Sequence, residues 1–151
     1  MKSKNIAFII FGLLLAGSVI FLSSFRFQTT EPWNQDQLLQ PADLANTLSS
    51  PTSKKPLVFC VGPGALIKGS IDMGPAHEAD NLKKFKRALS KLPRNTEIVI
   101  YCGCCPFEHC PNIRPAFKLL TEMKFTNQKL LNLEHNLRTD WIEKGYPVNP
   151  N

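Results

Sequence analysis

The sequence lacks the basic stripe, interleaved with aromatic residues, that is typical of nucleic-acid-binding surfaces. Its formal net charge is +6, from 18 Lys and Arg against 12 Asp and Glu, and three of the basic residues (Lys2, Lys4 and Arg26) lie in or beside an N-terminal leader. The rest of the chain therefore holds 15 basic and 12 acidic residues, a net charge of +3. This weak bias suits the attraction of small anions, and we expect no nucleic-acid partner.

The sequence also has no internal repeat and no low-complexity segment, so it reads as an ordinary globular chain. With 151 residues it is long enough for one domain and too short for two comfortable ones. Hydrophobic residues make up 43% and charged residues 20% of the chain. That balance allows a buried core once the N-terminal leader is set aside.

The N-terminal leader contains no acidic residue before Glu31, and Lys2 and Lys4 precede an apolar run at residues 6–22. A positive start followed by an apolar run is the pattern of an export signal. The run of 17 residues is long for a signal peptide and short for a spanning helix. No A-x-A cleavage site and no lipid-accepting Cys follows it. We predict that residues 1–27 are a signal peptide or membrane anchor, and favour an uncleaved anchor.

The leader sets the expected location of the remaining chain. If it is uncleaved, residues 6–22 contact the membrane and the body lies on the outer side. We therefore predict an exported protein, periplasmic or otherwise extracytoplasmic, with the inner membrane as its place of anchoring. Residues 28–37 are polar and read as a linker in which Trp33 is the first residue to dock on the domain, which we place at residues 38–149.

The predicted domain alternates strand-like and helix-like segments, which indicates an α/β fold with a small, mostly parallel sheet and helices on both faces. Short apolar runs indicate buried strands, and apolar residues at helical spacing indicate helices. We expect strands at residues 57–61, 97–101 and 129–133, a weaker extended segment at 67–73, and helices at 41–48, 78–92, 112–124 and 137–144.

Four of the five cysteines lie in one loop, between a predicted strand and a predicted helix: Cys102, Cys104, Cys105 and Cys110. In open α/β sheets, ligands bind at the carboxyl ends of the strands. The start of a helix offers unpaired N–H groups and a positive dipole end, which lower the pKa of a nearby thiol. The loop therefore stands where this fold class performs chemistry.

Three kinds of chemistry suit the loop. In the first, Cys102 is a nucleophile that carries sulfur as a persulfide, with backbone N–H groups around Gly103 stabilising the anion. In the second, the C-x-x-C pair Cys102 and Cys105 exchanges disulfides. In the third, a soft metal such as Zn²⁺ or Cu⁺ binds. The candidate ligands for that metal are Cys102, Cys104, Cys105, His109 and Cys110. Because exported cysteines usually form disulfides, a structural role also stays open.

Other residues of the loop and its surroundings are candidates for binding. Gly103, His109, Asn112 and Arg114 are the expected substrate-binding residues, with Asn112 as the cap of the helix and Arg114 in its first turn. Cys60 ends the first predicted strand and is most simply a small core residue. A sharper hypothesis brings Cys60 to Cys102 as a resolving thiol, which requires Cα atoms within about 7 Å.

Four segments resemble the rhodanese-like (sulfurtransferase) family, in matching order over roughly residues 38–148. They are Ile67-Lys-Gly-Ser-Ile71, Ile98-Val-Ile-Tyr-Cys102, the helix and strand that follow the loop, and the tail Trp141-Ile-Glu-Lys-Gly-Tyr-Pro-Val148. The resemblance implies a rhodanese-like fold and gives Cys102 the role of catalytic cysteine. It implies a sulfurtransferase of the thiosulfate or polysulfide:acceptor type, without a cofactor. The expected partners are a small sulfur-containing anion and an acceptor thiol.

The sequence departs from that family at the active loop. The first strand ends in Cys60-Val-Gly62, where the family has Asp-Val-Arg, and neither Arg nor Lys occurs between Cys102 and Asn112. The family's basic loop residue helps with an anionic donor, so its absence argues against ordinary thiosulfate chemistry. The loop is typical of a cysteine-rich variant.

Overall fold

The structure is a computed structural model and describes residues 31–150. The predicted leader at residues 1–27, with its apolar run at 6–22, lies outside the described residues, as does the beginning of the predicted linker. Within residues 31–150, no helix has both the length and the apolar character needed to cross a membrane.

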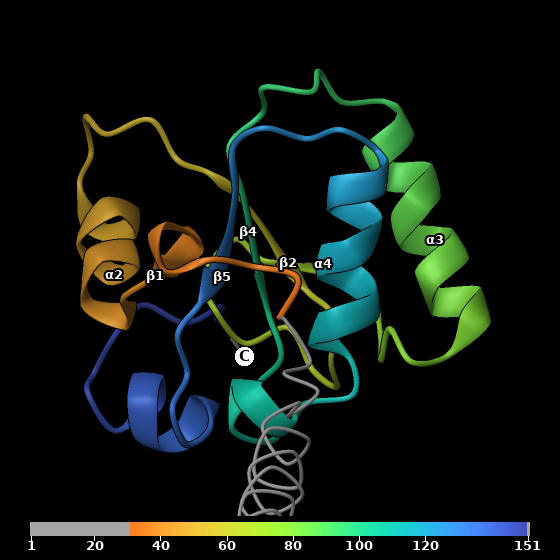
Figure 1. Ribbon diagram of the computed structural model, residues 1–151. Helices are drawn as coiled ribbons and strands as arrows, with labels where there is room; N and C mark the ends of the chain where they lie inside the picture. Colours follow the sequence, from red (N-terminus) through yellow and green to blue (C-terminus); the bar gives the residue numbers. More distant parts are fainter. Residues whose placement is uncertain (1–30, 151) are drawn as a thin grey trace, which may run out of the picture. The chain divides into compact units, whose positions relative to one another are not determined.

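Five strands form one sheet in the order β1-β5-β4-β2-β3, and every neighbouring pair is parallel (Figure 1). The predicted α/β fold with a parallel sheet is confirmed. The strands are β1 (Leu38–Leu39), β2 (Leu57–Cys60), β3 (Ile71–Asp72), β4 (Ile98–Tyr101) and β5 (Gln128–Leu131). The helices and helical turns are η2 (Gln35–Gln37), α2 (Pro41–Ser49), α3 (Ala79–Ser90), η3 (Phe107–His109), α4 (Ile113–Glu122) and η4 (Arg138–Ile142).

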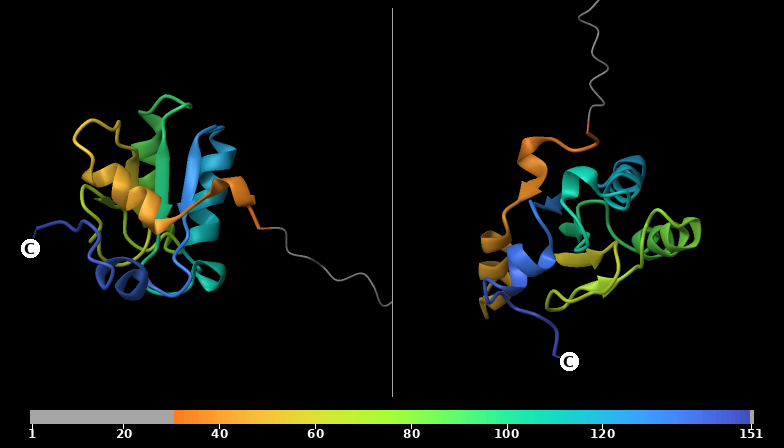
Figure 2. Two further views of the ribbon diagram at one scale, coloured as in Figure 1. Left: turned by 90° about the vertical axis from the view of Figure 1, so that its left-hand side faces the viewer. Right: turned by 90° about the horizontal axis from the view of Figure 1, so that it is seen from below.

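The central strands are apolar on both sides because helices cover both faces of the sheet. All four residues of β4 are buried, and β4 pairs with β2 in the register Val58↔Val99 and Cys60↔Tyr101. On one face, α3 and α4 cover the sheet. Phe85 of α3 is buried there in a core cluster that includes residues of α4 and of the strands. On the other face, α2 and the buried Trp141 of η4 complete a second cluster. Figure 2 shows the sheet between these two layers.

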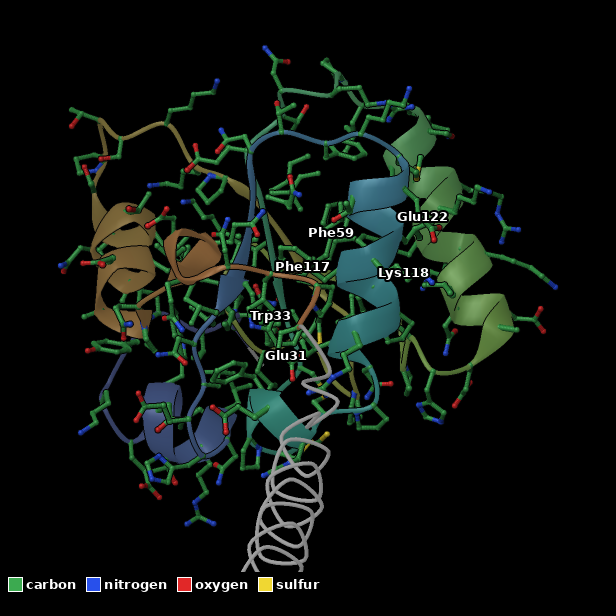
Figure 3. All side chains as sticks on the ribbon, in the orientation of Figure 1. Glu31, Trp33, Phe59, Phe117, Lys118 and Glu122 are labelled. Atoms are coloured by element: carbon green, nitrogen blue, oxygen red, sulfur yellow. The ribbon has the colours of Figure 1, made fainter. Side chains whose placement is uncertain are left out.

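The prediction of a linker at residues 28–37 is wrong for residues 34–37, which belong to the domain. Residues Gln35–Gln37 form η2 with a capping box on Asn34, and the chain continues into β1, which pairs with β5 at the edge of the sheet. Trp33 docks as expected: its ring lies 5.7 Å from that of Phe117 and 6.0 Å from that of Phe107. Figure 3 labels Trp33 and Phe117 among the side chains of the domain.

Two of the segments that carry the family resemblance meet in space. Trp141 donates from its indole N–H to the Pro147 carbonyl, at 3.0 Å, and Val148 forms an antiparallel bridge with Ile67. Gly69, two positions after Ile67, has a positive φ of 73°, a conformation that glycine adopts without steric cost. The predicted extended segment at 67–73 is thus a tight turn followed by the short strand β3.

Because all strands are parallel, the ends of β2, β4 and β5 lie at one edge of the sheet. The loop after β4 contains the clustered cysteines, and the segment after β5 reaches it: the Leu137 N–H donates to the Gly103 carbonyl, at 3.0 Å. A side chain on Gly103 would meet Leu137, since an added Cβ would lie 2.8 Å from the Leu137 Cβ. Gly103 is therefore required for this close approach.

Candidate functional site: a buried thiolate at the end of β4

Cys102 is the first residue after β4, and only 2% of it is exposed. Its sulfur lies at the beginning of α4, where the Asn112 side chain donates from Nδ2 to Sγ over 3.4 Å. The Sγ atoms of Cys104 and Cys110 lie within 4.8 Å of this sulfur. Chiefly through the neighbouring Cys110 thiol, and against the effect of burial, the groups around the sulfur lower the pKa of Cys102 to about 5. This pKa favours the thiolate form of Cys102 at neutral pH.

The orientation of the Asn112 amide is fixed by its other contact. Its Oδ1 accepts from the backbone N–H of His77, at 3.1 Å, and lies 2.7 Å from His77 Nδ1. A backbone N–H can only donate, so the oxygen must face His77 and the NH₂ group must face Cys102. Asn112 occupies the predicted cap position, but its side chain makes no capping hydrogen bond to α4.

His77 was missed by the sequence analysis, which assigned it no function. It lies 35 positions before Asn112, in the segment that precedes α3, and α3 packs against α4. No local motif marks this contact.

Gly62 forms the wall on the other side of the Cys102 sulfur. A Cβ built on Gly62 would lie 2.3 Å from Cys102 Sγ, closer than two such atoms can approach. Gly62, which has no side chain, therefore provides the space that this sulfur occupies.

Three of the predicted thiols come together. The Sγ atoms of Cys102, Cys104 and Cys110 all lie within 4.8 Å of one another, and those of Cys102 and Cys104 are 3.3 Å apart. The hydrogen bond to the Cys102 thiolate and burial raise the pKa of Cys110 far above its ordinary value. Loss of solvent around its sulfur and the neighbouring thiols raise the pKa of Cys104 to about 12. The group thus combines one thiolate with two protonated thiols, and its spacing also suits a single soft metal ion.

Cys105 and His109 lie outside this three-sulfur group. Cys105 is half-buried, with its Sγ 3.4 Å from that of Cys104. His109 is exposed at the end of η3. Of the five predicted metal-ligand candidates, the structure brings together three.

Cys60 faces the opposite side of the sheet from Cys102. It is buried in the core cluster that contains Tyr101 and Trp141, and its thiol donates to the carbonyls of Gly62 and Gly64. Burial raises the pKa of Cys60 to about 11. The suggested approach of Cys60 to Cys102 does not fit this geometry, because consecutive strand positions point to opposite faces.

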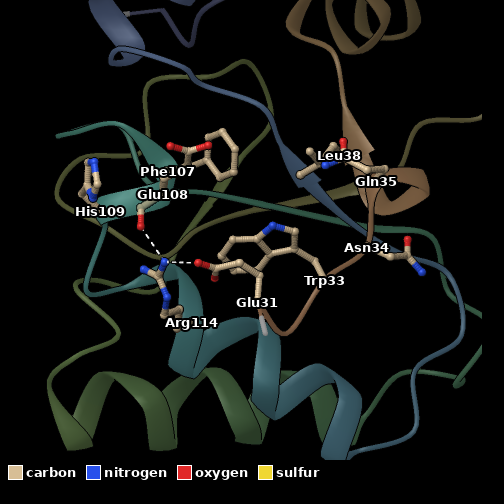
Figure 4. Close-up of a pocket in the computed structure, with 9 residues that line it drawn as sticks. All are labelled: Glu31, Trp33, Asn34, Gln35, Leu38, Phe107, Glu108, His109 and Arg114. Atoms are coloured by element: carbon tan, nitrogen blue, oxygen red, sulfur yellow. Dashed lines mark hydrogen bonds and ion pairs between the residues drawn. The ribbon is translucent and has the colours of Figure 1, made fainter. Parts of the chain in front are cut away.

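Arg114 is held away from the thiols. Its guanidinium pairs with Glu31, donates to the Glu108 carbonyl and lies 5.7 Å from the centre of the Trp33 ring. Figure 4 shows these groups around a pocket of about 640 Å³ that His109 also lines. No cysteine is among the residues that line this pocket, so Arg114 and His109 form a surface separate from the three sulfurs.

A second pocket, of about 310 Å³, does reach the thiols. Cys104 and Gly103 line it from the cysteine loop, and Leu66, Arg138 and Ile142 line it from two other segments. Leu66 and Ile142 are 45% and 42% exposed, which is unusual for large apolar side chains on this domain. Arg138 pairs with Glu143 at 3.1 Å, but it is largely exposed, so this pair is weak and can exchange partners.

Comparisons with known proteins agree with the fold. No protein-family model matches the chain, and no curated protein matches it. Among solved structures, the chain is similar to a cysteine-to-serine variant of EanB in complex with hercynine, with a TM-score of 0.50 and 18% sequence identity. The likeness covers 75% of this chain and 27% of the EanB chain, so it spans about a quarter of that protein. At this identity it supports the fold alone.

Proposed function

We propose that the protein is a rhodanese-like sulfurtransferase that carries sulfane sulfur as a persulfide on Cys102. The observation that carries this proposal is the position of the Cys102 sulfur at the end of β4, beside the Asn112 amide and the thiols of Cys104 and Cys110. The same donors can stabilise the negative charge of a persulfide, because they are fixed before sulfur arrives. The order of the family-like segments along the chain supports the same activity.

The loading step exchanges one sulfur–sulfur bond for another. The Cys102 thiolate attacks the sulfane sulfur of the donor, a new S–S bond forms on Cys102, and the donor's own S–S bond breaks. The electron pair of that bond leaves with the remainder of the donor, which is sulfite when the donor is thiosulfate. Neither Arg nor Lys lies between Cys102 and Asn112, so the loop offers no permanent cation to an anionic donor, and both polysulfide and thiosulfate are candidates. Loading requires the exposed Cys104 to move aside, because Cys102 is enclosed.

Mass spectrometry of the full chain tests this function. After incubation with polysulfide, and separately with thiosulfate, we expect a gain of one sulfur on the peptide that contains Cys102. Cys102→Ser abolishes the gain, and Cys105→Ser, the matched control in the same loop, retains it. Absence of added sulfur with both donors would overturn the proposal, and a stoichiometric metal in its place would indicate a metal-binding function.

Thiol–disulfide exchange is a second candidate, supported by the 3.3 Å separation of the Cys102 and Cys104 sulfurs. This geometry favours the pair Cys102 and Cys104 over the predicted C-x-x-C pair with Cys105. Disulfide mapping after mild oxidation tests it: a Cys102–Cys104 bond that dithiothreitol reduces is expected, and a fully reduced protein would exclude it.

A further inference from the structure

We propose that Cys104 is a second sulfur carrier, which takes the sulfane sulfur from Cys102 and presents it to a small acceptor thiol in the pocket beside it. This inference rests on the proposed function, since it requires a persulfide on Cys102. In this proposal the exposed thiol of Cys104 delivers the sulfur to the acceptor, so sulfur moves from the enclosed Cys102 to the surface.

The contrast in exposure between the two cysteines favours a relay. Cys102 is 2% exposed, and Gly62 and Asn112 both lie against its sulfur. An acceptor thiol larger than the sulfur donor is therefore hindered from reaching it. Cys104 is exposed, yet its sulfur lies 3.3 Å from that of Cys102. Cys104 is therefore the group through which sulfur on Cys102 can reach the surface.

The outer sulfur of a Cys102 persulfide lies about 2.05 Å from Sγ, the length of an S–S bond. The Cys104 sulfur lies 3.3 Å from Cys102 Sγ, which is within reach of a sulfur added there. Cys104 also lines the 310 Å³ pocket in which we place the acceptor. One thiol thus borders both the loaded sulfur and the proposed acceptor site.

The transfer itself is an exchange without net oxidation or reduction. The Cys104 sulfur attacks the outer sulfur of the Cys102 persulfide, and the bond between that sulfur and Cys102 Sγ breaks. The electron pair returns to Cys102 as its thiolate, and the proton of the Cys104 thiol passes to the transferred sulfur. No external oxidant, reductant or proton is needed.

The surroundings of Cys102 favour its departure as the leaving group. The Asn112 amide lies at its sulfur and stabilises the thiolate that forms when the bond to the transferred sulfur breaks. The exposed position of Cys104 then gives the transferred sulfur access to an acceptor.

The pocket beside Cys104 suits a small acceptor thiol that carries a carboxylate. Its volume of about 310 Å³ is at the lower end of the range for small-molecule sites. Leu66 and Ile142 offer apolar contact, and Arg138 offers a cation whose present partner, Glu143, is exposed. Glutathione and free cysteine are the probes with this chemistry.

The test compares two acceptors on protein that has been loaded with polysulfide and freed of excess donor. Cyanide is small enough to reach an enclosed persulfide, and glutathione is not. In Cys104→Ser both reactions are measured per Cys102 persulfide formed, so that any change in loading cancels, and we expect the reaction of that persulfide with cyanide to be retained. Sulfide release to glutathione should fall about tenfold or more, because an intramolecular step is lost. Cys105→Ser, the matched control, should behave as the unmodified chain with both acceptors. In the unmodified chain, alkylation and peptide mapping should find part of the sulfur on Cys104.

Two results would overturn the relay: an unchanged glutathione rate in Cys104→Ser, or sulfur that is found on Cys102 and never on Cys104 in the unmodified chain. Failure of the proposed function looks different, because Cys102 would then carry no sulfur in any of the proteins, before an acceptor is added.

Discussion

The side-chain amide of Asn112 donates a hydrogen bond to the sulfur of Cys102, across 3.4 Å, and links the start of α4 to the end of β4. Its oxygen accepts from the His77 backbone, so the amide cannot turn its acceptor toward the thiolate. This contact adds to the effects of the Cys110 thiol and the Cys104 backbone, which together lower the pKa of Cys102.

Asn112→Asp isolates this contact. An Asp at this position still accepts from His77 but offers Cys102 a negative oxygen in place of a donor. Loss of one hydrogen bond to a charged group is worth about 1.5–3 kcal/mol, so the pKa of Cys102 should rise by about 1 to 2 or more. The pH dependence of Cys102 alkylation, resolved by peptide mass spectrometry, measures it. Asn34→Asp, a change of the same charge at an exposed cap, should leave the profile unchanged; equal profiles for both variants would contradict the assigned contact.

Stability should depend on pH through Cys102. The pKa of Cys102 is about 5 in the folded chain and 9.0 for an ordinary thiol, so between these values the unfolded chain binds more protons. The free energy of unfolding should therefore rise with pH across this window, and the contribution is lost as the pH falls through about 5. Above pH 9 the trend reverses, since the pKa values of Cys60 and Cys104 are raised to about 11 and 12.

Urea titrations at a series of pH values measure this dependence. The control is Cys102→Ser, which should flatten the rise between pH 5 and 9 while leaving the decline above pH 9, because Cys60 is on the other face of the sheet. A rise of the same slope in the variant would show that other groups cause it.

Gly62→Ala should disturb the site by steric conflict. The added methyl group would lie 2.3 Å from Cys102 Sγ, so the sulfur or the end of β2 must shift. Overpacking of this kind costs about 1–3 kcal/mol, and displacement of the sulfur from its donors should slow sulfur loading. Thermal unfolding and the rate of persulfide formation check both effects. Unchanged stability together with unchanged loading would contradict the prediction, because it would mean that the end of β2 shifts to accept the methyl group at no cost.

Trp33→Ala should destabilise the domain, although Trp33 lies in the segment predicted as a linker. Its ring packs on Phe107 and Phe117 and beneath the Arg114 guanidinium. Truncation of a fully buried Trp costs 3–5 kcal/mol, so about 2 kcal/mol is expected for this half-buried ring. Denaturant unfolding measures the loss. Trp33→Phe, which keeps an aromatic ring, should recover part of it, and an unchanged midpoint in Trp33→Ala would show that the contact does not stabilise the domain.

Much of the fold follows from local sequence patterns. The apolar runs at 57–61 and 97–101 are strands because both faces of the sheet are covered, and Cys102 follows β4 as predicted. Strand β1 was not predicted, since two leucines after a polar stretch carry no periodicity and become a strand only by pairing with β5.

The choice among the loop thiols could not be made from spacing. Cys110 reaches Cys102 because the turn η3 folds the loop back, with Phe107 buried against the core. Cys105, at the C-x-x-C distance, does not join the three-sulfur group. Loop conformation here depends on tertiary packing, which leaves no local signal.

The position of Cys60 depends on the strand register, which the apolar runs alone did not fix. In the β2–β4 register Cys60 is the partner of Tyr101, and strand alternation then turns Cys102 to the other face. Aligning the predicted strands 57–61 and 97–101 by their ends would instead pair Cys60 with Ile100 and place it on the face of Cys102. Proximity at a sheet edge does not by itself bring two side chains together.

The donors around Cys102 come from segments that meet only when the chain has folded: the end of β4, the cysteine loop and the start of α4. In an unfolded chain each of these thiols is ordinary and protonated at neutral pH. The ultraviolet absorbance of a thiolate is therefore an intrinsic, label-free signal of native assembly. Refolding could therefore be followed through the sulfur atom that is proposed to react. A chain that has not finished folding would show no thiolate absorbance and no enhanced thiol reactivity.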